Sequence, residues 1–266
     1  MNNKILLFIP IYNCEKQIIR VTEKLNKKIL TRFDEVLVVN NRSTDKTEAV
    51  AIISLKKIQD CKVTLTRNLH NYGLGGSHKV AFNYMLNNGY DYCVVLHGDD
   101  QGDINDILPN LDSGEHKKFD CLLNSRFMPN STRVGYSKLR TFGNLCFNIL
   151  FSIASKRVQW DLGSGLCCYS KKFIEAKVVE MCSDDLTFNY TLQLYAASKK
   201  IKQKFFPSRW VEDDQVSNVK LFKQTWKMIK ILFLFVFKKQ YFLTHSFGDP
   251  NFTYKTKIIY QSNKVI

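Results

Sequence analysis

Three carboxylates and a histidine gather in the stretch His97-Gly98-Asp99-Asp100-Gln101-Gly102-Asp103. This stretch directly follows a short apolar run at residues 92–96, which is typical of a buried strand. Carboxylate and imidazole groups are common ligands of divalent cations, so the stretch is a candidate cation site. The alternative is an ordinary solvated turn. Three carboxylates in one short stretch are nevertheless notable in a chain with more basic than acidic residues.

Three more apolar runs are each followed by a polar or glycine-containing loop. The four runs lie at residues 4–9, 36–39, 63–66 and 92–96, and the loops after them lie at residues 10–13, 40–45, 67–76 and 97–103. Each loop alone has a plain structural explanation, such as a helix cap at Ser43 or Thr44 or a simple glycine turn. If the strands are parallel, however, all four loops converge on one edge of the sheet, where ligands usually bind.

The stretches between the apolar runs have apolar residues at helical spacing, which predicts alternating strands and helices. Ile18, Thr22, Leu25 and Ile29 recur at three- and four-residue steps, and a similar pattern before Asn88 predicts a helix over residues 77–88. This rhythm predicts an α/β fold with a single, mostly parallel, Rossmann-like sheet and helices on both faces. The alternation at residues 254–258 predicts a further, terminal strand.

The composition indicates a globular chain with a strong positive charge. The 266 residues are 45% apolar, and the formal net charge of +15 suits a polyanionic partner such as nucleic acid, a phosphorylated substrate or an anionic membrane. Eight cysteines without a CxxC pair favour reduced, buried thiols. The apolar run at residues 5–10 is too short for a signal peptide, so we expect a cytoplasmic protein.

Five ordered motifs resemble those of the family 2 glycosyltransferases with the GT-A fold. They are residues 9–13, 38–47, 71–76, 97–101 and 160–165. The fourth lies where this family has its metal-binding DxD, and the fifth is similar to its acceptor-side D-x-x-S-G. The pattern is nearest to the branch of the dolichyl- or polyprenyl-phosphate mannose synthases and covers roughly residues 4–220.

The resemblance implies a nucleotide-sugar donor and a divalent cation, Mn²⁺ or Mg²⁺. A cation that bridges the diphosphate stabilises the charge that develops when the sugar–phosphate bond breaks. Asp99 is the main expected ligand, and His97, Asp100 and Gln101 are further candidates as ligands or as partners of the ligands or the sugar. His97 has a capping or core-edge role as its alternative, and Asp103 is expected to cap a helix. The residues implied to bind the donor are Pro10, Tyr12, Asn13, Asn40, Asn41, Ser43, Gly73, Gly75, Gly76, Gly98, Arg126, Arg209 and Lys220.

Two departures from the family pattern bear on the donor. The second motif usually begins with two aspartates, one of which accepts a hydrogen bond from the nucleobase, but this chain has Asn40 and Asn41. An amide can both accept and donate, so uracil, guanine and cytosine all stay open. The first DxD position is His97, and an imidazole ligand shifts the preference from Mg²⁺ toward Mn²⁺.

Three carboxylates are candidates on the acceptor side. Asp184 and Asp185 precede a helical stretch at residues 187–197, where relatives that glycosylate hydroxyl groups carry a catalytic Asp, and Asp161 lies in the fifth motif. A position before a helix also suits any carboxylate because of the helix dipole. A phosphate acceptor is already anionic and needs no base, so the role of the Asp184-Asp185 pair depends on the acceptor.

Two basic, amphipathic stretches occupy the second half of the chain. Residues 136–157 carry an apolar stripe with Lys and Arg at both ends, and residues 219–242 repeat this pattern around the apolar run 231–237. Such helices lie in the headgroup layer of an anionic membrane, although packing on the sheet or on a second subunit is the alternative. The apolar run is too short to span a bilayer.

We therefore expect a metal-dependent, inverting hexosyltransferase that acts on a lipid-linked acceptor, polyprenyl phosphate or a lipid-linked glycan, as a peripheral protein at the inner face of the cell membrane. Residues 1–215 form the predicted catalytic domain, with a nucleotide-sugar half to about residue 126, and residues 216–266 form the lid end, amphipathic helix and tail. The alternatives are a soluble transferase acting on a saccharide hydroxyl, an inactive transferase-fold protein, and a nucleic-acid-binding protein. The last rests on charge alone, since no RNP, KH, zinc-finger or helix-turn-helix pattern is present, and no nucleic-acid partner is expected.

Overall fold

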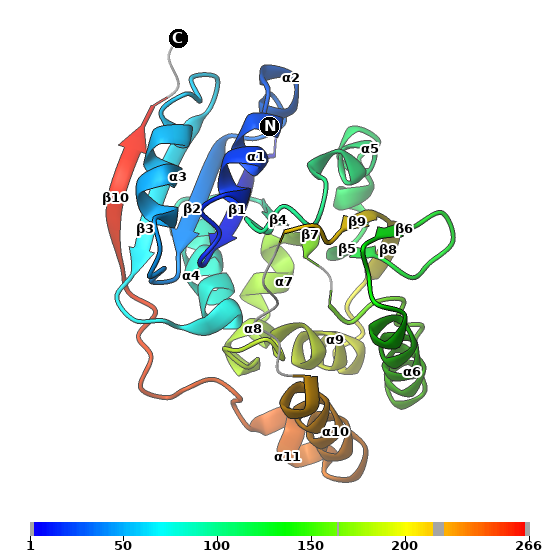
Figure 1. The fold of residues 1–266 in the computed structure, drawn as a ribbon. Coiled ribbons are helices and arrows are strands. Elements are labelled where there is room, and N and C mark those ends of the chain that lie inside the picture. The colour runs from blue at the N-terminus through cyan, green and yellow to red at the C-terminus, as the bar shows by residue number, and fades with distance from the viewer. Residues whose placement is uncertain (1–2, 164, 215–220, 264–266) are drawn as a thin grey trace.

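The computed structural model describes residues 3–163, 165–214 and 221–263. Its centre is an eight-stranded sheet in the order β10-β3-β2-β1-β4-β7-β5-β8 (Figure 1). The strands are β1 (Ile5–Ile11), β2 (Glu35–Asn40), β3 (Lys62–Asn68), β4 (Tyr92–Leu96), β5 (Cys121–Ser125), β7 (Leu166–Ser170), β8 (Gln203–Pro207) and β10 (Thr256–Ser262). Strands β7 and β10 run antiparallel to their neighbours and the others share one direction, which confirms the mostly parallel α/β sheet.

The register of the first four strands brings their carboxyl ends to one edge. Strand β1 lies between β2 and β4, and the last residue of β1, Ile11, is paired with the last residue of β2, Asn40. Asn40 is in turn paired with Arg67 near the end of β3. The loops after these strands therefore emerge side by side, as the parallel pattern predicts.

Helices cover both faces of the sheet. The longer ones are α1 (Gln17–Lys24), α3 (Thr47–Leu55), α4 (Gly73–Asn87), α6 (Lys138–Ser155), α9 (Phe188–Ser198) and α10 (Leu221–Phe237), and the shorter ones are α2 (Lys27–Leu30), α5 (Leu108–Asp112), α7 (Lys171–Glu175), α8 (Val178–Met181) and α11 (Lys239–Thr244). Successive side chains of a strand point to opposite faces. Leu7 and Ile9 accordingly pack with α1 and α3, whereas Leu6 and Phe8 pack with α4 and α9.

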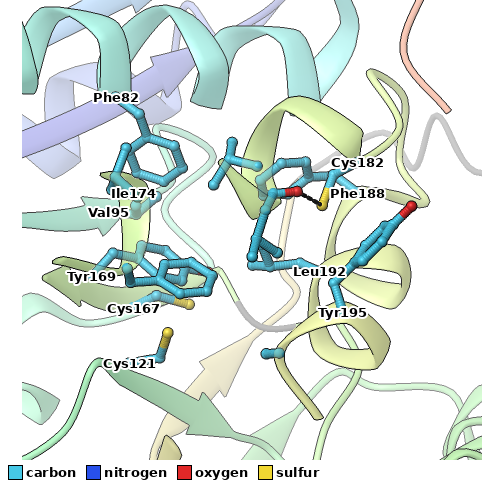
Figure 2. Close-up of a cluster of buried hydrophobic side chains, with 14 of the residues drawn as sticks. Phe82, Val95, Cys121, Cys167, Tyr169, Ile174, Cys182, Phe188, Leu192 and Tyr195 are labelled. Atoms are coloured by element: carbon cyan, nitrogen blue, oxygen red, sulfur yellow. Dashed lines mark hydrogen bonds between the residues drawn. The ribbon is translucent and has the colours of Figure 1, made fainter. Parts of the chain in front are cut away.

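The core under α4 and α9 is rich in aromatic rings and thiols. Figure 2 shows Phe82 of α4 on the same side as Val95 of β4 and Cys121 of β5, with Phe188 of α9 across from them beside Cys182. Cys121 and Cys167 contribute small apolar groups to this core, and all eight cysteines are free thiols, as the sequence predicts. Burial raises the pKa of the Cys121 thiol well above its usual value, so it stays protonated and unreactive.

Helices α6, α9 and α10 pack together at one end of the molecule (Figure 1). Helix α10 buries Met228, Ile231 and Phe235 in the core, whereas α6 buries only Asn148 and Phe151 among its described side chains. A small two-stranded sheet of β6 (Thr132–Val134) and β9 (Arg209–Val211) lies beside them. None of the helices in the described residues is long and apolar enough to cross a membrane.

Several local predictions need correction. The helix expected through Ile29 is two helices, because Leu25 leaves the helical conformation and Asn26 caps α2 by accepting from Ile29 N. Helix α3 begins at Thr47 without a side-chain cap from Ser43 or Thr44. The stretch expected as one helix over residues 219–242 is divided into α10 and α11. The predicted terminal strand is confirmed as β10, which pairs antiparallel with β3. The domain boundaries stay a prediction.

Candidate active site

A cleft of about 860 Å³ opens beyond the carboxyl ends of β1, β2 and β4. Of the predicted site residues, those that line it are Pro10, Tyr12, Asn13, Asn41, Gly73, His97, Gly98, Asp99, Gln101, Arg126 and Asp185. Those in the described part of the chain that do not line it are Asn40, Ser43, Gly75, Gly76, Asp161, Asp184 and Arg209. Lys220, like Ser164 of the fifth motif, lies outside the described residues.

The loops after β1 and β2 hold each other in place by hydrogen bonds. Asn13 N donates to Ser43 Oγ at 3.1 Å, and Asn13 Oδ1 accepts from Thr44 N at 2.8 Å. Asn13 adopts a left-handed backbone, which asparagine tolerates better than most residues. Ser43 thus supports the loop from behind, while the side chain of Tyr12 remains 39% exposed at the cleft and offers a ring for stacking.

Both asparagines that replace the usual aspartates are committed to protein contacts. Asn40 is 1% exposed, donates to Glu48 Oε2 at 2.7 Å and accepts from Ser43 N at 2.9 Å. Asn41 Oδ1 accepts from Tyr72 N and from Asn68 Nδ2. The expectation that Asn40 contacts the donor is therefore not supported by its position, because its side chain points into the protein.

The glycine turn is the first turn of α4 and packs against another segment. A Cβ at Gly75 would lie 2.1 Å from Ser183 O, and one at Gly73 would lie 2.4 Å from Asp184 O. Gly76 N donates to Asp184 O at 3.1 Å. The glycines were expected to let the backbone approach a ligand, but Gly73 and Gly75 instead let α4 approach the backbone at residues 183–185, and Gly76 makes room for the side chain of Tyr72.

Of the three carboxylates in its loop, Asp99 is the one that lines the cleft. Asp100 binds Arg20 and Lys24, and Asp103 caps a short 3₁₀ helix by accepting from Asn105 N, as the sequence predicts. Asp99 accepts from Gln101 N at 3.2 Å. Burial raises the pKa of the Asp99 carboxyl to about 6, with a smaller contribution from neighbouring Asp100.

His97 offers a second group that fits a cation. Its Nε2 atom is buried and has no hydrogen-bond partner among the described residues, and Gly165 leaves room for the ring. Burial, with help from nearby Arg126, lowers the pKa of His97 to about 4, so the imidazole is neutral at pH 7 and keeps a lone pair. Among the described residues there is no cluster of three His, Cys, Asp or Glu that could hold a metal. Together with Gln101, His97 and Asp99 would hold a divalent cation only if diphosphate oxygens or water complete its coordination.

Arg126 and Asp161 form a buried ion pair at the middle of the cleft. Arg126 Nε and Nη2 each donate to one Asp161 oxygen at 2.8 Å, and the two side chains are 6% and 0% exposed. Burial lowers the pKa of Arg126, but Asp161 more than compensates and holds it above its ordinary value. Asp161 lies behind Arg126, so its geometry suits a counter-ion for Arg126 and not contact with an acceptor.

Glu212 and Arg140 also line the cleft, and the sequence patterns did not single them out as site residues. Arg140 Nη1 donates to Glu212 Oε2 at 2.6 Å, and Glu212 contributes a small upward shift to the pKa of Asp99. Arg140 stands in the first turn of α6 and Glu212 directly follows β9. The sequence signal that could have found them is their position, because Arg140 lies in the first turn of a helix and Glu212 lies directly after a strand.

Asp184 and Asp185 are adjacent but occupy different environments. Asp184 accepts from Lys79 Nζ at 2.7 Å, from Tyr254 Oη at 2.9 Å and from Asp249 N at 2.6 Å, so its oxygens are fully engaged. Asp185 reaches the cleft and binds Lys227. Burial raises the pKa of Asp185, but Lys227 and Thr187 outweigh this effect and lower it.

Arg209 is not near the proposed diphosphate position. Its backbone N donates to Asp106 Oδ2 at 2.8 Å, and the residue is exposed. Arg209 therefore lies on the outer side of β9, while the next residue, Trp210, lines the cleft. The Cζ atom of Arg126 lies 4.8 Å from the centre of the Trp210 ring. The alternation of a strand explains the difference, because successive side chains point to opposite sides.

The far end of the cleft is apolar. Leu139 and Phe147 of α6, Leu186 before α9, and Phe222 and Met228 of α10 line it, with Asn144, Gln224 and Thr225 as polar side chains on the same helices. Phe222 is 95% exposed, so this end is open to the surroundings of the molecule. The cleft thus joins a polar end, which carries Asp99, to an apolar end between two helices.

The mostly parallel α/β sheet with a cleft beyond the carboxyl ends of its strands is the arrangement that the GT-A fold has. A family model described as glycosyl transferase family 2 matches residues 7–180. The chain belongs to this glycosyltransferase family. No curated protein matches the chain.

Solved structures with a similar fold include glucosyl-3-phosphoglycerate synthase from Mycobacterium tuberculosis. One such structure has 16% identity and a TM-score of 0.58 and covers 88% of this chain and 80% of that chain. Another, in complex with Mn²⁺ and UDP-glucose, has 14% identity and a TM-score of 0.59 and covers 88% of this chain and 78% of that chain. A third, with Mn²⁺, UDP and glucosyl-3-phosphoglycerate, has 13% identity and a TM-score of 0.59, with coverage of 99% and 91%.

Proposed function

We propose that this chain transfers a hexosyl unit, with inversion, from a nucleotide sugar to an acceptor carried by a lipid. The acceptor is polyprenyl phosphate or a lipid-linked glycan, as in the polyprenyl-phosphate mannose synthase branch, and the reaction takes place at the cytosolic face of the cell membrane. The observation that carries this proposal is the cleft itself, which runs from the polar loop of Asp99 to an apolar opening between α6 and α10.

The polar end suits a nucleoside diphosphate and a divalent cation. Mn²⁺ or Mg²⁺ would neutralise the charge of the departing diphosphate. Asp99, His97 and Gln101 would hold the cation, and the neutral imidazole of His97 favours Mn²⁺. The complexes of the similar structures with Mn²⁺ and UDP-glucose support this assignment. Tyr12, which is exposed at the cleft, would stack on the base.

The apolar end suits a lipid because its helices expose apolar side chains outside the cleft as well. On α6 these are Phe142, Leu145, Ile149, Leu150 and Ile153, and on α10 they are Trp226, Ile229, Phe233, Val236 and Phe237. All members of the predicted α6 stripe are exposed and not packed on the sheet. Basic residues at the ends of α6 and along α10 would attract anionic headgroups, at about 1 kcal/mol per well-placed charge.

The polar side chains between the two ends are consistent with a phosphate acceptor. Arg126 and Arg140 both line the cleft, and each already has one carboxylate partner. Guanidinium groups recognise phosphate well, and an anionic phosphate attacks without a base. Lys227 does not line the cleft itself but is paired with Asp185, which does.

A hydroxyl acceptor is the second candidate, and Asp185 is the observation that favours it. Its carboxylate faces the cleft and its lowered pKa keeps it ionised at neutral pH. A base in this position would accept the proton of a hydroxyl group. Two of the similar structures are complexes with glycerol 3-phosphate and with phosphoglyceric acid, both small hydroxyl compounds, which supports this candidate.

A panel of donors and acceptors tests the proposal. UDP, GDP and CDP sugars are each supplied with Mn²⁺ or Mg²⁺, and transfer is measured to polyprenyl phosphate and to a soluble sugar or phosphoglycerate. Transfer to polyprenyl phosphate that survives Asp185→Asn supports the lipid-phosphate acceptor. Transfer only to a soluble hydroxyl, abolished by Asp185→Asn, supports the second candidate. No binding of any nucleotide sugar with either metal contradicts both.

A further inference from the structure

One guanidinium connects the loop of Asp99 to the segment at and after β9, which also lines the cleft. Arg20, on α1, donates from Nε to Asp100 Oδ2 at 2.7 Å. Its two terminal nitrogens donate to the two oxygens of Asp214 at 3.1 Å and 2.8 Å. The pKa of Arg20 is raised by the hydrogen bond to Asp214 and then by that to Asp100.

We propose that Arg20 is a positioning residue of the transferase, which fixes the Asp99 loop (residues 97–103) and the β9 segment (residues 209–214) relative to each other. The coupling of the two segments does not depend on the proposed function. Its effect on binding of the cation and diphosphate does rest on the proposed function. It does not require Arg20 to touch the donor, since Arg20 does not line the cleft.

Within the Asp99 loop, Arg20 binds Asp100, whose backbone has an unusual conformation. Asp100 has a φ of +61°, in the left-handed region that L side chains rarely adopt. Its side chain is 10% exposed, and Lys24 Nζ binds its second oxygen. A buried carboxylate needs such partners. The two cations therefore hold Asp100 toward α1, which leaves its neighbour Asp99 directed at the cleft.

The β9 segment supplies the matching wall. Val211 N donates to Gln101 O at 3.0 Å, and Gly102 forms an isolated antiparallel bridge with Trp210. Arg20 adds a side-chain connection at Asp214, just beyond these backbone contacts. Because Trp210 and Glu212 of this segment line the cleft with Asp99, a shift of either element changes the distance between the two walls.

An exposed ion pair by itself contributes little to stability. The side chains of Arg20 and Asp214 are 39% and 35% exposed, so the proposal predicts an effect on positioning larger than the effect on folding. The chain offers a matched control: Arg32 forms a similar two-bond contact with Asp112 away from the cleft.

The test compares Arg20→Gln and Arg20→Lys with Arg32→Gln in two measurements. The first is hydrogen exchange without ligand, in which Arg20→Gln should speed exchange of amides at residues 97–102 and 209–214 by about tenfold. Arg32→Gln should leave both segments unchanged, and Arg20→Lys should give an intermediate result because an ammonium lacks the fork that serves two carboxylates. Unchanged exchange in Arg20→Gln would overturn the proposal.

The second measurement is calorimetric binding of a nucleoside diphosphate with Mn²⁺. Arg20→Gln should weaken it by about tenfold, the usual size for a residue that orients a metal ligand, with a melting temperature close to that of Arg32→Gln. Equal affinities in the two variants would overturn the link to donor binding. If the wild-type chain binds no diphosphate while the exchange result holds, the proposed function fails and the coupling of the two segments stands.

Discussion

The polar and apolar ends of the cleft are built in opposite ways. At the polar end, short loops after parallel strands are fixed by many hydrogen bonds, such as those joining Asn13 to Ser43 and Thr44. At the apolar end, two helices expose large side chains that nothing in the described chain covers. The polar end, which would bind the donor in the proposed function, is therefore preorganised by the protein itself, whereas the apolar end would present a surface to the acceptor.

The largest expected effect concerns the ion pair between the two ends. Asp161→Asn removes the negative charge that compensates Arg126, so the free energy of unfolding should fall by about 3–5 kcal/mol in urea denaturation. The exposed pair of Arg32 gives the control, because Asp112→Asn should cost at most about 1 kcal/mol. Equal costs for both substitutions would show that Asp161 is not an internal counter-ion.

The next effect tests the polar end alone. Asp99→Asn removes the carboxylate expected to hold the cation, so Mn²⁺-dependent binding of a nucleoside diphosphate should weaken by about a hundredfold or more. Calorimetry measures this directly. Asp103→Asn serves as the control in the same loop, since Asp103 caps a short helix, and it should retain binding. Unchanged binding in Asp99→Asn would favour the inactive transferase-fold alternative.

The apolar end should respond to substitutions that leave the polar end untouched. Replacing exposed Ile149 and Trp226 with serine should weaken binding to vesicles that contain anionic lipid by about 2 kcal/mol, or about thirtyfold, in a sedimentation assay. Ile53→Ser, on the exposed side of α3, is the control. A double variant that sediments like the wild-type chain would contradict a membrane surface. A double variant that forms a smaller oligomer than the wild-type chain would show that the exposed faces bind another copy of the chain instead.

A smaller effect links the polar end to pH. The pKa of Asp99 is about 6 and that of His97 about 4. A proton on Asp99 competes with the cation, so Mn²⁺ affinity should rise by about tenfold between pH 5 and pH 7, while His97 is neutral throughout. Affinity that is flat over this range would show that Asp99 is ionised well below pH 6 or does not hold the cation.

The sequence predicted the sheet and the polar end well because both follow from local patterns. Parallel strands with polar loops after them must bring those loops to one edge, and this placed Tyr12, Asn41 and Asp99 in one cleft. The roles of single side chains were harder to predict. Whether Gly75 faces a ligand or another backbone depends on residues 183–185, which are distant in sequence.

The residues at the middle of the cleft also had roles that the sequence did not predict correctly. Arg126 was predicted as a phosphate contact and Asp161 as an acceptor-side carboxylate, but the two bind each other across 35 positions of the chain. Arg140 and Glu212, 72 positions apart, were not predicted at all. Pairing between distant segments is set by how the elements pack, and no periodic pattern reveals it.

The pairing of β10 with β3 has a consequence for how the chain folds. Thr256 lies opposite Asn68, so one edge of the sheet is completed by a strand that comes almost two hundred positions later. Contacts between such distant positions form slowly, because a long loop must close before they are gained. Until β10 arrives, the backbone edge of β3 is exposed and can pair with another chain, which makes this edge the expected site of misassembly during refolding.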